Sequence, residues 1–256
     1  MSSTKIVRAH VGRTPPTLGR VVVACAEREW HELPAMMIDC ALREAGYDTT
    51  LLGASTSPLR LNQYLQDLGP EAVAVSCSVL GALPAARRFI EASTASGVPI
   101  LVGGPAFGPD GVRARALGAT AWAPDAQSAV AAVAALPAVV GEVPKLPSPV
   151  VAELAALDTG HHRLTEQILS SWSTAPADGP VSRTFAGEAI RQLLHAVAAA
   201  LLTGDPRPGP QTYGWIDELL AARKIATTAD GALAAATVAA LADLPLAREL
   251  AGRHLP

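Results

Sequence analysis

A glutamate and a histidine two residues apart, Glu29 and His31, follow a short apolar run at residues 21–26. The run is rich in β-branched residues and too short for a surface helix, which predicts a strand covered on both faces. In an open parallel sheet, the loops that leave the carboxyl ends of the strands line the ligand site. If this loop is extended, residues two apart point the same way. Glu29 can then hold one imidazole nitrogen of His31 while the other nitrogen faces a ligand.

The composition limits the class of protein. The chain has 256 residues, 50% hydrophobic and 17% charged, which is enough for one large or two modest globular domains. A net charge of −3 and dispersed Lys and Arg argue against nucleic-acid binding. No apolar run reaches about 18 residues, so we expect no membrane span. The first 20 residues lack the apolar core of a secretion signal, so we expect a cytoplasmic protein.

The three cysteines, Cys25, Cys40 and Cys77, are odd in number and widely spaced. Their apolar surroundings suit buried, reduced thiols better than disulfides or a zinc site.

Strand and helix patterns alternate over residues 20–137. The predicted strands are 21–26, 49–52, 72–76, 99–102 and 119–123. The predicted helices are 34–46, 59–68, 83–95, 109–117 and 126–136. This alternation predicts an α/β domain with a doubly wound, five-stranded parallel sheet. In its flavodoxin-like version the strand order is 2-1-3-4-5, with the switch point between strands one and three.

Four loops then meet at one edge of the sheet. Loops 26–33 and 77–83 lie at the switch point, and loops 53–56 and 103–108 are their neighbours. A histidine, several hydroxyls and a glycine pair therefore converge there. Neither G-x-G-x-x-G nor G-x-x-x-x-G-K-[ST] occurs, which argues against a dinucleotide or a nucleoside triphosphate as the ligand.

Three short motifs lie on these loops: Glu29-Trp30-His31-Glu32-Leu33-Pro34, Ser76-Cys77-Ser78 and Gly103-Gly104. In residue type and order they resemble the D/E-x-H-x-x-G, S-x-L/T and G-G motifs of the cobalamin-binding domain family. That family includes methionine synthase, corrinoid carriers, mutases and cobalamin photoreceptors. The resemblance spans about residues 20–137, and its E-x-H form is closest to the photoreceptor branch.

The resemblance implies a role for each motif. His31 replaces the nucleotide base as the lower axial ligand of cobalt, and Glu29 is its hydrogen-bonded partner. Ser76 and Ser78 line the slot for the displaced base. The glycine pair lets the backbone approach the nucleotide tail, where a Cβ would collide. The other cofactor-binding candidates on the same rim are Trp30, Gly53, Ser55 and Phe107.

Two positions depart from the family pattern, and plainer roles compete with the implied ones. Pro34 stands where the family usually has glycine, which can shift the entry into the first helix, and Ser78 replaces leucine or threonine. A loop histidine is often only solvated. Serines at strand ends often satisfy backbone groups, and a glycine pair can be a turn with positive φ. For Trp30 we expect cover of the first helix rather than shielding of a corrin.

The second half of the chain is predicted to be all-helical. Residues 143–149 are rich in proline and predict a stiff linker. Helical periodicity recurs at 150–157, 161–172, 185–202, 212–224, 229–241 and 246–254, with breakers at 173–182 and 204–210. Five or six helices then form a bundle or globin-like array, packed by stripes such as Ile190, Leu194, Val197 and Leu201. The predicted boundaries are a lead-in tail at 1–19, a cobalamin-binding domain at 20–140, a linker at 141–149 and a helical domain at 150–256.

Polar and aromatic residues of the helical half are candidates for holding a second chromophore. Glu188, Arg191 and His195 share one helical stripe, for which a solvated face is the plainer interpretation. The domain order and the stretch 213–220 resemble the photocobilins, photoreceptors that combine cobalamin with biliverdin. The resemblance implies a bilin held without a thioether, unless the aromatic residues belong to an ordinary core. The candidate bilin-binding residues are Arg191, His195, Trp172, Tyr213 and Trp215.

These resemblances imply a cobalamin-dependent light sensor, because light cleaves the cobalt–carbon bond of an alkylcobalamin and the protein supplies the ligand and the readout. The expected cofactors are adenosylcobalamin and biliverdin. Outside Glu29 and His31 no nucleophile–base pair stands out, which favours a sensor over an enzyme. The expected partners are a second copy, in a homo-oligomer such as a dimer, or a downstream signalling protein. The alternatives are a corrinoid carrier that shuttles methyl groups between methyltransferases and a cobalamin storage module.

Overall fold

The chain folds into two compact units, residues 1–144 and 145–256, and each is described here by itself. The computed structural model describes residues 16–172, 180–223 and 231–256. Most of the predicted lead-in tail lies outside these ranges.

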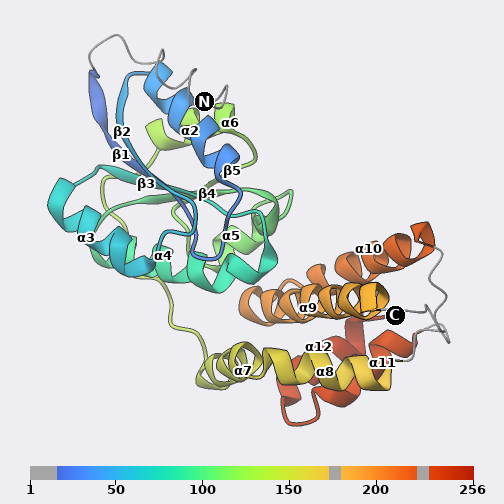
Figure 1. Ribbon diagram of the computed structural model, residues 1–256. Helices are drawn as coiled ribbons and strands as arrows, with labels where there is room; N and C mark the ends of the chain where they lie inside the picture. Colours follow the sequence, from blue (N-terminus) through green and yellow to red (C-terminus); the bar gives the residue numbers. More distant parts are fainter. Residues whose placement is uncertain (1–15, 173–179, 224–230) are drawn as a thin grey trace. The chain divides into compact units, whose positions relative to one another are not determined.

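The amino-terminal unit is built on a five-stranded parallel sheet (Figure 1). Its strands are β1 (Leu18–Cys25), β2 (Tyr47–Gly53), β3 (Ala72–Ser76), β4 (Ile100–Gly103) and β5 (Ala121–Ala123). Their order is β2-β1-β3-β4-β5, and every neighbouring pair is parallel. The predicted flavodoxin-like fold and strand order are therefore confirmed. Strands β3 and β4 are entirely buried, and β1 is buried from Val21 to its end, as their continuous apolar runs predict.

Helices connect the strands. They are α2 (Glu32–Glu44), α3 (Pro58–Leu68), α4 (Leu83–Ala95), α5 (Val112–Ala116) and α6 (Ala126–Ala134). Helix α2 packs against α6, and α3 packs against α4, so the sheet is covered from both faces. Two single 3₁₀ turns, Leu80–Ala82 and Pro105–Phe107, follow β3 and β4. The predicted helix at 109–117 is shorter than expected, because Gly111 takes a left-handed conformation immediately before α5.

Some predicted boundaries are wrong by a few residues. The lead-in tail was expected to end at residue 19, but β1 begins at Leu18. The linker was expected to extend to residue 149, but α7 begins at Ser148, because a proline at the second helical position needs no N–H partner. On the other side, the buried Arg87 donates to the carbonyls of Leu117 and Pro144. The linker is thus fixed to the amino-terminal unit as far as Pro144.

The second unit has six helices within the described ranges and no strand there (Figure 1). They are α7 (Ser148–Thr159), α8 (His161–Ser171), α9 (Pro180–Thr203), α10 (Pro208–Ala222), α11 (Ala232–Ala240) and α12 (Pro245–His254). Helix α9 packs against α7, α8, α10 and α12. Of its predicted stripe, Ile190, Leu194 and Val197 are fully buried and Leu201 is half-buried. Pro208 starts α10 although residues 204–210 were expected to be loop.

Helix α9 also qualifies as a candidate membrane span, which the sequence analysis did not anticipate. Within the part of the chain that the structure describes, Arg183–Thr203 is long and apolar enough by length and composition to cross a membrane. However, 61% of its most apolar window is buried inside the unit. A core helix of this length passes the same test, and the neighbours of α9 account for its apolar surface.

Candidate functional site

The loop from β1 to α2 turns sharply before it reaches His31. Arg28 adopts a left-handed conformation (φ 70°), and the Glu29 N–H donates to the Ala26 carbonyl at 2.9 Å. This turn points the Glu29 side chain into the protein. Helix α2 then begins with His31 as its N-cap residue. Pro34 falls within the first turn, where no intrahelical N–H bond is required, so the departure from glycine fits the loop.

Glu29 is fully buried and accepts hydrogen bonds on both carboxylate oxygens. Oε1 accepts from the backbone N–H of His31 at 2.8 Å and from its Nδ1 at 2.6 Å. Oε2 accepts from the backbone N–H groups of Ser78 at 2.5 Å and Val79 at 3.1 Å. Burial alone raises the pKa of this carboxyl, but the N–H donors of His31, Ser78 and Val79 lower it below its ordinary value. The carboxylate is therefore ionised at neutral pH.

This contact determines which nitrogen of His31 is available. An ionised carboxylate only accepts hydrogen bonds, so Nδ1 carries a proton, and in the neutral imidazole Nε2 then carries the lone pair. The side chain of His31 is 65% exposed. The arrangement is the one expected from the spacing of Glu29 and His31, although a tight turn rather than an extended loop produces it. Chemically, it presents one oriented nitrogen ligand at the surface.

Gly53 and Ser55 shape the histidine loop from the end of β2. Gly53 has a φ of 88°, which only glycine adopts readily. The Ser55 hydroxyl accepts from the Arg28 N–H at 3.1 Å, and the Ser55 N–H donates to the Glu29 carbonyl at 2.8 Å. Ser55 thus holds the histidine loop through both its hydroxyl and its backbone N–H.

The glycine pair packs against neighbouring backbone. A Cβ on Gly103 would lie 2.7 Å from the Ala123 carbonyl oxygen, and one on Gly104 would lie 2.4 Å from that of Cys77. Gly104 also has a φ of 105°. Close packing of the protein itself therefore requires both glycines. Phe107, another predicted site residue, is fully buried at the end of the 3₁₀ turn that follows the glycine pair.

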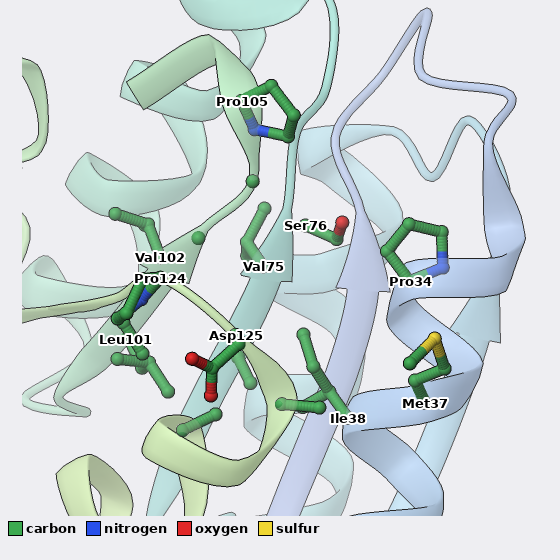
Figure 2. A pocket seen from close by; sticks show the side chains of 16 residues that line it. Pro34, Met37, Ile38, Val75, Ser76, Leu101, Val102, Pro105, Pro124 and Asp125 are labelled. Atoms are coloured by element: carbon green, nitrogen blue, oxygen red, sulfur yellow. The ribbon is translucent and has the colours of Figure 1, made fainter. Parts of the chain in front are cut away.

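A cavity of about 190 Å³ opens beside this loop on the α2 and α6 side of the sheet (Figure 2). Its lining residues are Pro34, Met37, Ile38, Ala74, Val75, Ser76, Leu101, Val102, Gly103, Gly104, Pro105, Ala123, Pro124, Asp125, Ala126 and Ala129. Among them, Ser76 is buried, and its hydroxyl has no hydrogen-bond partner in the described part of the chain. A buried hydroxyl without a protein partner can bond to an ordered water or to a polar atom of a ligand. We call this cavity the slot.

Sequence reasoning did not identify the α2 and α6 walls of the slot. Pro34, Met37 and Ile38 come from the start of α2, and Asp125 is the N-cap of α6. Hydrogen bonds from the N–H groups of that turn, first that of Ser128, lower the pKa of Asp125. Apolar residues at helical spacing look the same in sequence whether they face a core or a cavity. No sequence signal therefore distinguished these lining residues from ordinary core residues.

Ser78 and Trp30, two further predicted cofactor-binding residues, lie in different environments. The half-buried Ser78 contributes its backbone N–H to Glu29. Trp30 was expected to cover α2, and the structure contradicts this: the side chain is 74% exposed, because the turn at Arg28 directs Glu29 inward and leaves Trp30 on the outside.

The thiols agree with the prediction in part. Cys25 and Cys77 are buried, while Cys40 is only half-buried on α2, and none of the three forms a disulfide. Burial and the charge of Glu29 raise the pKa of Cys25 to about 12, and burial also raises the pKa of Cys77. Both thiols are therefore protonated and unreactive at neutral pH.

The candidate bilin residues differ in their exposure and contacts. Trp172 and Tyr213 are buried in the core of the helical unit, while Trp215 is 46% exposed. Arg191 forms an ion pair with Glu188, which lowers the pKa of that carboxyl. The ring of His195 lies 4.6 Å from that of His161.

Comparison with known proteins bears on the amino-terminal unit. Residues 19–134 match the model of the B12 binding domain family. A search of curated proteins gives no match. Among solved structures, a cobalamin-binding protein from Desulfitobacterium hafniense is 20% identical, with a TM-score of 0.42, and the match covers 50% of this chain and 64% of that one.

Two similar structures come from Methanosarcina barkeri. The methanol:cobalamin methyltransferase complex is 24% identical, with a TM-score of 0.41 and coverage of 48% of each chain. The monomethylamine corrinoid protein is 15% identical, with a TM-score of 0.41 and coverage of 50% of this chain and 63% of that one. This chain thus spans about half to two thirds of the structures that it matches. The family match supports placing residues 19–134, which carry the sheet, the histidine loop and the slot, in the B12-binding domain family.

Proposed function

We propose that the amino-terminal unit binds cobalamin with the nucleotide base displaced from cobalt and with His31 Nε2 as the lower axial ligand. One observation carries this proposal: the fully buried Glu29 carboxylate binds Nδ1 of an imidazole that is itself exposed. Such a carboxylate–histidine pair fixes the tautomer and raises the basicity of the metal-binding nitrogen. A merely solvated histidine does not require a buried charge beneath it.

The slot supports the proposal that the nucleotide base is displaced from cobalt and bound by the protein. Its volume of about 190 Å³ is below the range of about 300–1,000 Å³ that encloses a drug-sized ligand. It therefore suits a fragment of the cofactor, the displaced heteroaromatic base, rather than the whole molecule. Ser76, whose hydroxyl has no partner among the described residues, would help to hold that base. The corrin ring would then lie outside the slot, over His31.

The residues of this chain would orient and hold the corrinoid, and the cobalt of the bound corrinoid would supply the group-transfer chemistry. Glu29 keeps the Nδ1 proton of His31 in place and ties the histidine loop to the backbone of Ser78 and Val79. Because these two contacts use one rigid carboxylate, a movement of the loop after β3 would be transmitted to His31.

We propose that the chain is a corrinoid carrier, which uses its bound corrinoid to pass methyl groups to or from a methyltransferase. In this proposal the methyltransferase is the enzyme and the chain is its partner. The exposure of His31 is compatible with this choice, since a bound cobalt would lie at the surface of the amino-terminal unit. The light sensor, the adenosyl ligand, biliverdin, the dimer and the cytoplasmic location remain predictions.

Uptake of hydroxocobalamin by the purified full chain tests the binding proposal. The expected result is a stable complex, and cobinamide, which has no base of its own, should show the absorption spectrum of a nitrogen-bound cobalt when it binds to the chain. The His31→Ala variant should lose that axial nitrogen. A complex with the base of the cofactor still on cobalt, or no uptake, would overturn the proposal.

A second experiment separates the carrier from the light sensor. The chain is loaded with methylcobalamin and with adenosylcobalamin in the dark, and its mass in solution is measured before and after illumination. A carrier should keep the same mass and should exchange methyl groups with a corrinoid methyltransferase. A light-driven change in mass with adenosylcobalamin would favour the sensor instead.

A further inference from the structure

Three large apolar side chains beside His31 are exposed to solvent. Trp30 is 74% exposed, and Leu33 and Met37 are each 53% exposed. We call these three residues the apolar seat. Exposed apolar side chains scattered singly need no explanation, but a group of them at a binding site marks a contact surface. These three belong to one loop and the first two turns of one helix.

The local geometry makes the seat continuous with the proposed binding site. Leu33 and Met37 are four residues apart in α2 and therefore share one face of the helix. Met37 is also one of the residues that line the slot (Figure 2). Trp30 directly precedes His31. The seat thus extends from the metal-binding imidazole to the wall of the slot.

We propose that the apolar seat supports the corrin ring and that Trp30 is a corrin-contacting residue. This inference rests on the proposed function, since it takes His31 as the cobalt ligand. Consecutive Cα atoms are only about 3.8 Å apart. A corrin macrocycle whose cobalt is bound by His31 is broader than the distance between neighbouring Cα atoms. The exposed indole of Trp30 would therefore contact the macrocycle.

The contact would have two consequences. Covering the indole removes apolar surface from water and strengthens binding of any corrinoid, whether or not it carries a nucleotide. It also excludes water from the exposed imidazole of His31. A partner protein could cover the same three residues. The corrin is favoured because Trp30 adjoins the cobalt ligand and Met37 lines the slot.

The test compares Trp30→Ala with a matched control, Trp215→Ala. Trp215 is also exposed, at 46%, but it lies on α10 of the helical unit. Each full-length variant is titrated with hydroxocobalamin and with cobinamide, which lacks the nucleotide and its base. Affinity is measured by equilibrium dialysis, and quenching of tryptophan fluorescence provides a second readout. Trp30→Phe tests rescue by another aromatic ring, and circular dichroism checks the fold of each variant.

The expected result is a loss of about tenfold in affinity for both corrinoids in Trp30→Ala. Trp30→Phe should recover most of this loss, Trp215→Ala should match the wild type, and corrinoid-dependent quenching should decrease most in the two Trp30 variants. If wild-type binding depends on His31 but Trp30→Ala stays within twofold of it for both probes, the seat is overturned and the proposed function stands. If binding does not depend on His31, both proposals fail.

Discussion

The two units each contain a buried glutamate that accepts backbone hydrogen bonds, and the difference between them separates a binding site from a structural contact. Glu153 on α7 accepts from the N–H groups of Leu246 and Ala247 at 2.9 and 2.8 Å, so it caps the first turn of α12. Glu29 likewise accepts three backbone N–H groups, but it also holds an exposed imidazole. Burial and satisfied hydrogen bonds are common to both. The presentation of a reactive group to solvent is found only at Glu29.

The comparison extends to the glycines. In the helical unit, Gly214 of α10 has nothing within 4 Å of a built Cβ, so glycine there serves no packing need. In the amino-terminal unit, Gly103 and Gly104 are enclosed by backbone carbonyls. The glycine pair at the rim of the sheet is thus packed more tightly than Gly214, as a site assembled from several loops requires.

The largest expected effect is that of Gly104→Ala. The new Cβ would meet the Cys77 carbonyl oxygen at 2.4 Å at a φ of 105°, so we expect the free energy of unfolding to fall by about 3 kcal/mol. Gly214→Ala is the control and should raise it by roughly 0.5–1 kcal/mol. Urea denaturation followed by circular dichroism measures both. Equal effects at the two positions would remove the contrast between the units.

The next largest effect is that of His31→Ala on corrinoid binding. Removing the axial ligand should weaken hydroxocobalamin binding by about 100-fold or more while the fold is retained, because the imidazole is mostly exposed. His162→Ala, an exposed histidine of the helical unit, should bind like the wild type. Equilibrium dialysis gives the affinities. Similar losses in the two variants would refute a specific role for position 31.

Paired substitutions of the two buried glutamates sharpen the comparison directly. Glu29→Gln and Glu153→Gln each replace a charged acceptor, so each should lower the free energy of unfolding by about 2 kcal/mol. Only Glu29→Gln should also weaken corrinoid binding, by about tenfold, since it changes the support of His31. A comparable loss of affinity in Glu153→Gln would show that the helical unit also determines corrinoid binding.

The smallest expected effect is in the acid stability of the amino-terminal unit. The pKa of Glu29 is lower in the folded protein than in the unfolded chain, where it is about 4.3. Its contribution to stability is therefore fully present above about pH 4.3 and is lost as the pH falls through the folded pKa. The difference in unfolding free energy between wild type and Glu29→Gln should be constant from neutral pH to about pH 5. It should then decrease on further acidification, and a difference that grew instead would contradict the assigned direction.

The fold could be predicted because its signals are local and repeated. Apolar β-branched runs alternate with helical periodicity, and the parallel pairing of β1 with both β2 and β3 follows from that alternation. Boundaries were less accurate. Pro208 and Ser148 begin helices inside segments expected to be irregular, because a proline in the first helical turn is compatible with both states.

At the candidate site, the spacing of Glu29 and His31 predicted their contact, but three other features could not be inferred. The left-handed turn at Arg28 exposes Trp30, and the backbone N–H groups of Ser78 and Val79 meet Glu29 from a loop about 50 residues away. The α2 wall of the slot depends on which apolar residues face a cavity. Each of these features depends on three-dimensional packing, to which residue type and spacing give no direct access.

The most direct test of the central claim is electron paramagnetic resonance of cob(II)alamin bound to the full chain. The protein is prepared once with ordinary histidine and once with ¹⁵N-labelled histidine. If His31 binds cobalt, the nitrogen splitting of the axial lines should change from a triplet to a doublet on labelling, and His31→Ala should abolish the doublet. A triplet that persists in the labelled protein would mean that the cofactor keeps its own base, and this would contradict the account.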